Sequence, residues 1–397
     1  MNSGTQGALV AGVGMIAFSK PGQSAPYDKM GSDAIRLALQ DAGISFDLIE
    51  QAYAGFVYGD SCAGQKVIYK AGMTGIPIVN VNNNCSTGST ALYLARQAVE
   101  SGAVDCVLAV GFEQMMPGAL GMVFSDRPSP FVDFDALTDE LVDVDLPLAL
   151  RYFGGAGKKH MELYGTTLED FAKVRAKASR HASQNPLSVF KNVLTTEDVM
   201  ESPVLWPGVM TRLMACPPTC GAAAAVLVSP AFAKRHGLTP PVRIVAQAMT
   251  TDLPNSFNTR DMRYVAGCDM TKRAAEAVYE KAGVGPEDIN VVELHDCFAH
   301  NEVLTYEGLG LCEPGGAQRF IANGDNTYGG KFVTNPSGGL LSKGHPLGAT
   351  GLAQCYELSH QLRGSADNRQ VENVRFALQH NIGLGGACVV TLYEKAA

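Results

Sequence analysis

The N-terminal part of the chain alternates between apolar runs and segments with helical spacing. Residues 10–18 form an apolar run typical of a buried strand leading into a turn, and residues 27–42 carry apolar side chains at the spacing of an amphipathic helix. Residues 51–57 predict an extended segment, 85–101 a helix opened by small polar residues, and 104–110 a strand buried on both faces. This alternation predicts an α/β sheet.

The second half of the chain repeats this pattern. Three segments match in order: residues 41–49 with 281–289, 85–92 with 345–352, and 104–110 with 374–380. Two similar halves of this kind predict a pseudo-twofold core. Cys85 and His345 would then begin equivalent helices, and the symmetry would bring a thiol and an imidazole to one place.

The repeat sets the expected domain boundaries. We expect residues 1–117 to form the first part of an N-terminal half and residues 239–397 to form a C-terminal half. Residues 118–238 differ in character, and we expect an inserted loop domain there, followed from about residue 205 by the return of the N-terminal half.

Composition excludes several classes of protein. A chain of 397 residues with 46% hydrophobic and 18% charged residues folds, and its net charge of −8 argues against a nucleic acid partner. No apolar run is long enough to span a membrane, and the N-terminal apolar run is not preceded by the basic residues of a signal peptide. The ten cysteines lack the spacing of a disulfide framework and are expected to be free thiols.

A basic segment stands out in this acidic chain. Residues 151–191 contain eight Lys or Arg residues and three acids. A solvated helix face would explain any single residue. The more specific alternative is a binding site for the phosphates of a cofactor, and the candidate residues are Lys173, Arg175, Lys177 and Arg180.

Two familiar motifs do not carry their usual function here. Gly12 and Gly14 fit a dinucleotide fingerprint, but Pro21 and Gly22 follow before the next helix begins, so no helix N-terminus would face a pyrophosphate. Residues 216–220 pair two cysteines without a second ligand pair nearby, which argues against a structural zinc site. No metal is expected.

Cys85 is the candidate nucleophile. A cysteine at a helix N-terminus meets the positive end of the helix dipole, which favours the thiolate. Most cysteines are small buried hydrophobes, and Cys106, inside an apolar strand, is the example of that alternative.

Further candidates follow predicted strands or lie in glycine-rich loops. His295 and Cys297 end an apolar run, where open α/β sheets place ligands, although a core histidine and a core cysteine would give the same pattern. His345 lies among glycines that allow close approach of the backbone to a substrate. Residues 379–386 close the last strand with a loop whose amides could donate to an oxyanion, and His380 within it reads as structural.

At these residues the sequence resembles the thiolase superfamily, and within it the SCP2-thiolase subgroup, over nearly the whole chain. The motifs that carry the resemblance are Asn-Cys-Ser at Cys85, His-Asp-Cys-Phe at 295–298 and Gly-His-Pro at His345. Other thiolases have a Cys-x-Gly motif that supplies an acid/base thiol, where this chain has Asn381-Ile-Gly383. The resemblance therefore implies that Cys297 has taken over that role, which Cys388 does not fill. A second departure is Cys220, where thiolases usually carry Asp.

The resemblance implies a fold, a reaction and partners. The fold would be a thiolase fold, with two similar βαβαβαββ halves in a five-layered α-β-α-β-α core and an inserted loop domain. The reaction would be CoA-dependent cleavage of 3-oxoacyl-CoA through an acyl-enzyme on Cys85, with His295, Cys297 and His345 catalytic and an oxyanion hole made by Cys85, Gly383, His295 and His345. CoA would be a co-substrate, no cofactor would be bound covalently, and the protein would be a homodimer.

Two other functions stay open at this stage. One is an acyl-CoA retro-aldolase on the same scaffold, against which Cys85 argues. The other is a noncatalytic protein that binds lipid or acyl-CoA, which the four catalytic residues together disfavour, as does the lack of a sterol carrier domain after residue 397. A role in degrading fatty acids, branched acyl chains or sterol side chains is expected. We expect a cytoplasmic location, with the peroxisome as the alternative, because residues 395–397 do not form a Ser-Lys-Leu-type signal.

Overall fold

The computed structural model describes residues 7–118, 121 and 123–396. Residues 1–6 and residue 397, which are the outer ends of the expected domains, lie outside the described residues. Residue 397 is also the last residue of the C-terminal tripeptide. The N-terminal half contains β1 (Leu9–Met15), α1 (Tyr27–Ala42), a 3₁₀ turn (Phe46–Leu48), β2 (Gln51–Gly55), α2 (Ala63–Tyr69), β3 (Ile78–Val81), α3 (Thr87–Glu100), β4 (Cys106–Glu113) and β7 (Gly221–Val228).

The C-terminal half follows the short helix α8 (Pro230–Arg235) and keeps this order with additional short helices inserted. It contains β8 (Val242–Thr250), α9 (Asn255–Asn258), α10 (Met262–Val265), α11 (Cys268–Ala282), a 3₁₀ turn (Pro286–Asp288), β9 (Val291–Glu293), α12 (Ala299–Gly308), α13 (Ala317–Ala322), β10 (Val333–Thr334), a π-helix (Gly339–Lys343), α14 (Thr350–Arg363), a 3₁₀ turn (Asp367–Arg369), β11 (Phe376–Gly383) and β12 (Ala387–Lys395).

The strand order confirms the repeat that the sequence predicted. Ten strands follow one another as β10-β9-β11-β12-β8-β1-β7-β4-β2-β3. The pairing between β8 and β1 is a single residue pair, Leu9 with Arg243, so the sheet divides there into two halves of five strands. In the N-terminal half β2 pairs in parallel with β3 and β4, and in the C-terminal half β9 pairs in parallel with β10 and β11. The remaining ladders within each half are antiparallel.

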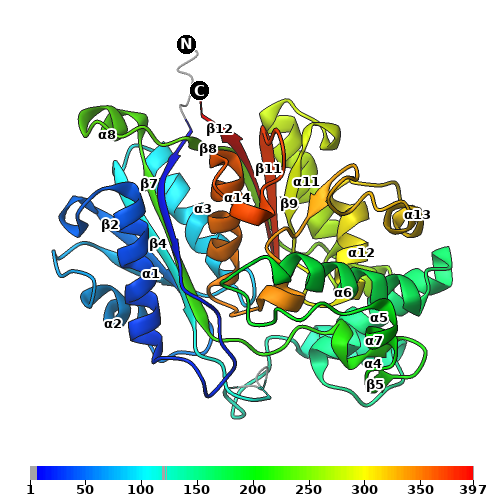
Figure 1. Ribbon diagram of the computed structural model, residues 1–397. Helices are drawn as coiled ribbons and strands as arrows, with labels where there is room; N and C mark the ends of the chain where they lie inside the picture. The colour runs from blue at the N-terminus through cyan, green and yellow to red at the C-terminus, as the bar shows by residue number, and fades with distance from the viewer. Residues whose placement is uncertain (1–6, 119–120, 122, 397) are drawn as a thin grey trace.

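The helices form three layers around these two half-sheets (Figure 1). α3 and α14 lie side by side in the middle, where α3 contacts β2, β4 and β8 while α14 contacts β11, β7 and β1. α1 packs on the outer face of β1 and β7, and α11 packs on the outer face of β8 and β12. The result is a five-layered α-β-α-β-α core, the architecture that the resemblance implied.

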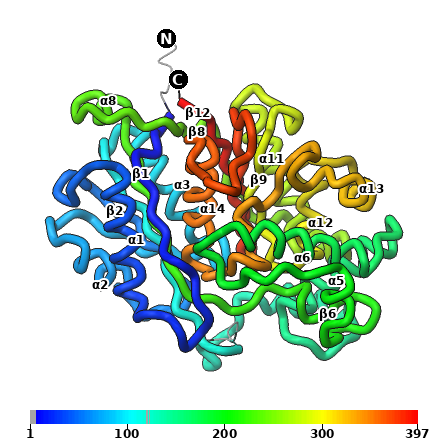
Figure 2. Tube along the Cα trace, viewed as in Figure 1, coloured from blue at the N-terminus to red at the C-terminus, as the bar shows by residue number. Residues whose placement is uncertain are grey.

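The inserted segment lies against the C-terminal half. It comprises α4 (Val132–Leu141), α5 (Leu148–Tyr164), α6 (Leu168–Ser183), α7 (Thr196–Met200), β5 (Val204–Trp206), β6 (Met210–Thr211) and a 3₁₀ turn (Arg212–Met214). α5 packs on α10 and α12, and α6 packs on α12 and the π-helix. Figure 2 shows α5 and α6 in green, next to α12. Its apolar side chains join one hydrophobic cluster with those of the C-terminal half.

The sequence boundaries differ from the structure at two places. The helix expected from Cys85 begins at Thr87, because Asn84 has a left-handed backbone (φ 50°) that keeps Cys85 in the preceding loop. The chain returns to the N-terminal half-sheet at Gly221 and not near residue 205, because β5 and β6 pair with each other in a separate two-stranded sheet. The helix predicted for residues 27–42 is confirmed at both ends.

Gly12 and Gly14 have a packing role. A Cβ on Gly12 would lie 2.2 Å from the carbonyl oxygen of Ala38, and one on Gly14 would lie 2.3 Å from that of Ala34. The two glycines therefore let β1 approach α1 closely, which explains the Gly-x-Gly pattern without a nucleotide.

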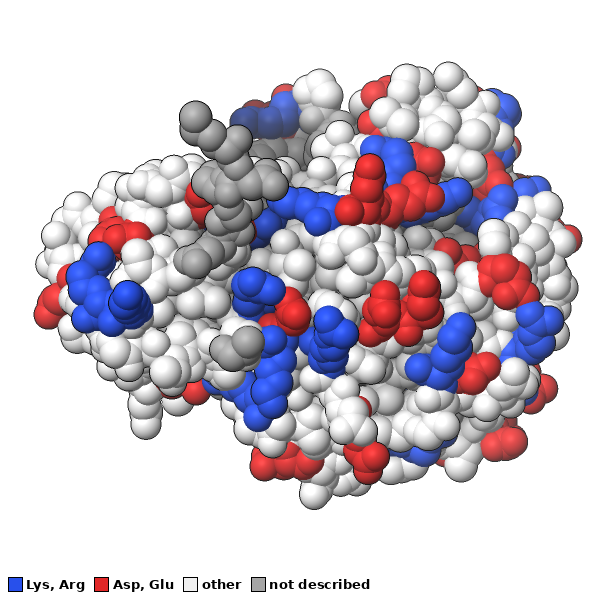
Figure 3. Space-filling model, turned by 90° about the horizontal axis from the view of Figure 1, so that it is seen from above, with Lys and Arg blue, Asp and Glu red and all other residues white. Residues whose placement is uncertain are grey.

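Surface and cysteine properties complete the description. Acidic and basic side chains are interspersed over the face seen in Figure 3.

Across the described ranges, no helix combines the length and the apolar character needed to cross a bilayer. All ten cysteines are free thiols, and Cys106 is a fully buried member of β4, as predicted.

Candidate active site

The two halves bring one thiol and two imidazoles together. The Sγ of Cys85 and one ring nitrogen each of His295 and His345 lie within 4.8 Å of one another, and all three side chains are buried. Cys85 comes from the loop before α3, His295 from the segment after β9, and His345 from the loop before α14. Among the described residues this is also the one group of three or more side chains whose geometry could hold a metal ion.

The loop that carries Cys85 is held by local hydrogen bonds and by the opposite half. The Oγ of Ser86 donates to the carbonyl oxygen of Asn83 (2.9 Å), and the N–H of Asn83 donates to the Oγ1 of Thr87 (2.8 Å). Gly383, at the end of β11, lies so close that a Cβ there would be 2.1 Å from the carbonyl oxygen of Asn83. The left-handed Asn84 is a strained backbone of the kind that concentrates at functional sites.

The thiol of Cys85 is protonated at rest. Burial raises the pKa of Cys85 to about 12, although the backbone N–H of Leu384 donates to the sulfur and opposes the rise. The thiolate that the sequence predicted at a helix N-terminus is therefore not favoured in the resting site, because desolvation is the largest influence on this pKa and raises it. A base must remove the proton when the nucleophile acts.

His345 is oriented to act as that base. The hydroxyl of Thr350 donates to the carbonyl oxygen of Pro346 (3.0 Å), so its oxygen accepts from the Nδ1–H of His345 (2.7 Å). On this basis we assign the proton to Nδ1 and the lone pair to Nε2. Burial, with smaller effects of His295 and Lys343, lowers the pKa of His345 well below its ordinary value and keeps the ring neutral.

His295 lies beside it as a second neutral ring. The amide nitrogen of Asn381 lies 2.8 Å from its Nδ1, and burial lowers the pKa of His295 to about 3. The Nε2 atoms of His295 and His345 are both buried without a hydrogen-bond partner in the described part of the protein. These two atoms are the polar groups that the site leaves for a substrate.

Cys297 is a buried neutral thiol beside this cluster. Burial and the neighbouring thiols of Cys216 and Cys85 raise the pKa of Cys297 well above its ordinary value. The N–H of Cys216 donates to the carbonyl oxygen of Cys297 (2.8 Å), and Ala215 bridges to Phe298. Sequence reasoning considered Cys216 only as a zinc ligand and missed its place beside Cys297.

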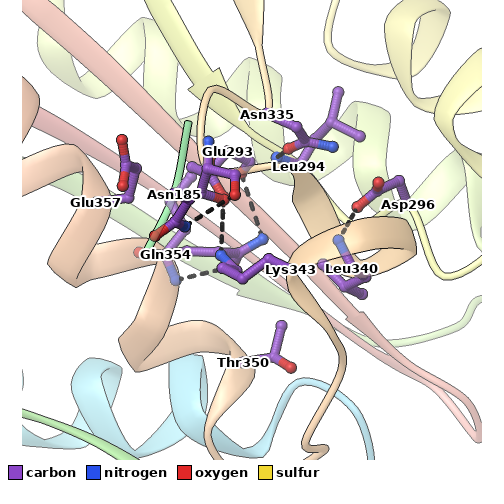
Figure 4. A network of polar contacts seen from close by, with 12 residues as sticks. Asn185, Glu293, Leu294, Asp296, Asn335, Leu340, Lys343, Thr350, Gln354 and Glu357 are labelled. Carbon is purple, nitrogen blue, oxygen red and sulfur yellow. Dashed lines mark hydrogen bonds and ion pairs between the residues drawn. The ribbon is translucent and has the colours of Figure 1, made fainter. Parts of the chain in front are cut away.

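Buried polar contacts fix the loops behind these residues. Asp296 accepts from the backbone N–H of Leu340 (2.7 Å), and Glu293 pairs with Lys343 (3.2 Å), as Figure 4 shows. The Oγ of Ser337 donates to the same Glu293 carboxylate (2.8 Å). The segment 293–297 and the π-helix are thereby held as one unit.

Glu113 is a further residue that the sequence did not single out. Its carboxylate accepts from the N–H groups of Val57 (3.0 Å), Tyr58 (2.9 Å) and Gly348 (3.0 Å), and burial raises the pKa of Glu113 to about 7. It ties the loop of His345 to the N-terminal half. The signal available in the sequence was a single acid at the end of an otherwise apolar strand.

Two of the four basic candidates are not on the surface. Lys177 is buried and paired with Glu302, and Arg175 is buried with its guanidinium donating to the Oγ of Ser342. These contacts correct the expectation that either could hold a phosphate, because both charges serve to dock α6 on the C-terminal half. Lys173 pairs with Glu169 on the surface, and Arg180 is exposed.

Other predicted residues have internal contacts. His380 lies against the Oγ1 of Thr271 (2.9 Å) and the N–H of His295 (3.4 Å), which supports the structural role expected for it. The Sγ of Cys220 donates to the carbonyl oxygen of Met115 (3.4 Å). The amide that reaches the sulfur of Cys85 is that of Leu384, one residue beyond Gly383.

Comparisons with known proteins match both halves of the chain. A model of the thiolase N-terminal domain matches residues 9–197, and a thiolase C-terminal domain-like model matches residues 254–393. Sterol carrier protein 2 from Bos taurus is 52% identical, over 97% of this chain and 72% of its own length. An acetyl-CoA acetyltransferase from Methanothermobacter thermautotrophicus is 35% identical, over 90% of this chain and 92% of its own.

Two solved structures share the fold. An Ltp2-ChsH2(DUF35) aldolase superposes with a TM-score of 0.83 at 23% identity, covering 98% of each chain. Human mitochondrial 3-ketoacyl-CoA thiolase in complex with CoA superposes with a TM-score of 0.74 at 18% identity, covering 99% of each chain.

Proposed function

The chain belongs to the thiolase family, and we propose that it cleaves 3-oxoacyl-CoA with CoA through an acyl-enzyme on Cys85. One observation carries the proposal: a buried thiol, Cys85, lies within 4.8 Å of two neutral imidazoles whose free Nε2 atoms share the same site. Membership of an acyltransferase family and this arrangement agree, because thiolysis needs a nucleophile, a base and a place for enolate charge.

The first half-reaction would break the C2–C3 bond. His345 Nε2 takes the proton of Cys85, and the thiolate attacks the 3-oxo carbon. The electron pair of the C2–C3 bond then moves to C2, and the thioester enolate that forms is held by the N–H groups on His345 and His295. Cys297, whose high pKa keeps it protonated, donates its proton to C2, so that C1 and C2 leave as acetyl-CoA, or as propanoyl-CoA from a 2-methyl substrate. The shortened acyl group stays on Cys85.

The second half-reaction would transfer the acyl group to CoA. The Cys297 thiolate takes the proton of the CoA thiol, and the CoA sulfur attacks the acyl carbon on Cys85. The tetrahedral intermediate collapses with Cys85 as the leaving group, and His345 returns the proton to it. The amides of Cys85 and Gly383 are the proposed donors to the intermediate oxyanion, and that of Leu384 lies next to them.

For CoA itself, the surface part of α6 is the proposed phosphate seat. Arg180 is the exposed cation there, and Lys173 lies about two turns earlier on the same side of α6, where it pairs with Glu169. Medium, long or branched 3-oxoacyl groups from fatty acids or sterol side chains are the proposed substrates, consistent with the similarity to sterol carrier protein 2.

We further propose a homodimer formed through β3. β3 is an edge of the sheet, and Val79 on it is 41% exposed, whereas β10 at the opposite edge is buried. An exposed edge strand invites pairing with a second copy. Light scattering should give twice the chain mass, and Val79→Lys should shift the protein to monomer; an unchanged mass for V79K would remove β3 from the interface.

The retro-aldolase alternative has less support. Aldol cleavage of a 3-hydroxyacyl-CoA proceeds without a nucleophilic thiol, yet here Cys85 and a correctly oriented base are both present. The likeness to the aldolase structure is at 23% identity and concerns the fold.

The test is CoA-dependent loss of acetoacetyl-CoA and of a longer 2-methyl-3-oxoacyl-CoA. Wild-type protein should cleave at least one of them and show acyl mass on the peptide of Cys85 when CoA is withheld. Cys85→Ser should show neither. Cleavage of a 3-hydroxyacyl-CoA by C85S, without cleavage of either 3-oxo substrate by the wild type, would favour the aldolase instead.

A further inference from the structure

Behind His295 lies a series of buried side chains joined by hydrogen bonds, and the contacts indicate which atom donates in each bond. It begins at Gln379, whose Nε2 lies 2.8 Å from the carbonyl oxygen of Gly351. A backbone carbonyl only accepts, so this atom must be the amide nitrogen. The other end of the amide, Oε1, accepts from the hydroxyl of Tyr393. The orientation of Gln379 is therefore determined at both ends.

The next two hydrogen bonds in the series involve Ser89 and then Asn381. The same Nε2 of Gln379 donates to the Oγ of Ser89 (2.8 Å), so this oxygen already accepts one bond, and we assign its hydroxyl proton to the Oδ1 of Asn381, an acceptor 2.9 Å away. This leaves the Nδ2 of Asn381 facing the Nδ1 of His295 at 2.8 Å. Gln379, Ser89, Asn381 and His295 have no exposed surface.

We infer that Asn381, oriented by Ser89 and Gln379, holds His295 in the tautomer with hydrogen on Nε2, opposite to the tautomer that Thr350 imposes on His345. An amide NH₂ can only donate, so Nδ1 of His295 must accept and its proton must sit on Nε2. Asn381 is thus a positioning residue, and it occupies the position where other thiolases have the acid/base cysteine of the Cys-x-Gly motif. The inference rests on the proposed function for its chemical meaning but not for its geometry.

The opposite tautomers give the site one acceptor and one donor. His345 Nε2 can take the proton of Cys85, while His295 Nε2–H can donate to the enolate oxygen. With the other tautomer of His295, both Nε2 atoms would carry lone pairs beside a thiol. Two imidazole lone pairs and a thiolate are the ligands that Zn²⁺ prefers. Asn381 therefore also keeps this cluster from offering three metal ligands.

The direct test uses ¹⁵N-histidine-labelled wild-type protein. Long-range ¹H–¹⁵N spectra, assigned with His295→Gln and His345→Gln, should show hydrogen on Nε2 of His295 and on Nδ1 of His345. The same tautomer on both rings, or hydrogen on Nδ1 of His295, overturns the inference. No turnover is needed, so the result stands whether or not 3-oxoacyl-CoA is cleaved.

Asn381→Asp provides the second test, because the carboxylate keeps the shape but can only accept. His295 should then carry its hydrogen on Nδ1, kcat should fall by about 10²–10³ with the loss of one oxyanion donor, and KM should change little. A carboxylate behind a histidine ligand also favours metal binding, so Zn²⁺ should bind N381D roughly 10–100-fold more tightly than wild type.

Two controls separate tautomer from added charge. Gln247→Glu places another buried carboxylate on the same sheet, where its amide now donates to Thr391 (2.8 Å) and not to a histidine, and should leave Zn²⁺ affinity unchanged. N381D/H295Q should lose the gain in affinity. A gain that persists in the double variant, or appears equally in Q247E, would assign it to charge alone and contradict the inference.

Discussion

The ring of His345 meets the ring of His295 edge to face, with centroids 5.0 Å apart and planes at 87°. Both rings are neutral, because burial is the largest influence on each pKa and lowers both. The Nδ1 atoms of the two rings have different hydrogen-bond partners: Thr350 for His345 and Asn381 for His295. The pair therefore divides proton acceptance and proton donation between two residues of the same type.

Thr350→Val should remove the base. Valine keeps the shape of threonine but leaves the Nδ1–H of His345 buried without an acceptor, so the ring gains by moving its hydrogen to Nε2. We expect kcat to fall about 10²-fold or more, with KM little changed. Steady-state kinetics check this, with Thr350→Ser, which keeps the hydroxyl, as the control near wild-type activity. A T350V protein within a few-fold of wild type would show that Thr350 does not set the tautomer.

The high pKa of Cys85 predicts how alkylation depends on pH. Since the neutral thiol dominates below about pH 12, the thiolate fraction rises with pH over the whole accessible range. In His345→Ala, iodoacetamide labelling of Cys85 should accelerate roughly tenfold per pH unit between about pH 7 and 9. Peptide mass mapping separates Cys85 from the exposed Cys62. A rate that levels off within this range would mean a much lower pKa.

Lys177 and Arg180 should respond differently to substitution. Lys177→Met leaves the buried Glu302 without its cationic partner, so the free energy of unfolding should fall by about 3–5 kcal/mol. Arg180→Ala should leave stability within about 0.5 kcal/mol, because its side chain is exposed, and should raise KM for CoA. Urea denaturation and CoA titration measure the two effects. A KM change for K177M at full stability, or none for R180A, would reverse these assignments.

Gly339→Ala tests the contact between the π-helix and Asp296. Gly339 has φ 60°, and a Cβ there would lie 2.1 Å from the Oδ2 of Asp296. Gly364 is a matched control, because it has φ 74° and open space around the added atom. G364A should cost about 1 kcal/mol from backbone strain alone, and G339A should cost more and lower kcat. Equal losses of stability with unchanged kcat would separate Asp296 from catalysis.

The sequence predicted elements and motifs better than contacts. The helix at residues 27–42 and the repeat are confirmed, because periodicity and glycine stops are local properties of the chain. Cys85, His295 and His345 meet as the repeat and the motifs predicted. These features needed no knowledge of which surfaces face each other.

What the sequence missed depends on burial. Lys177 reads as a surface charge until α6 is packed on α12, and Cys85 reads as an activated thiol until its loop is covered by the end of β11. Asn381 was noted only as a departure from a Cys-x-Gly motif. Its partner Ser89 lies 292 residues away, and that pairing exists only in the folded protein.

That long pairing has a consequence for how activity appears during folding. Ser89 belongs to α3 of the N-terminal half, while Asn381 and His295 belong to the C-terminal half. Either half could acquire its strands and helices and still lack a defined proton pattern, since the imidazole receives its orientation from across the boundary. Recovery of turnover after dilution from denaturant should therefore lag behind the recovery of helical circular dichroism and report the docking of the two halves.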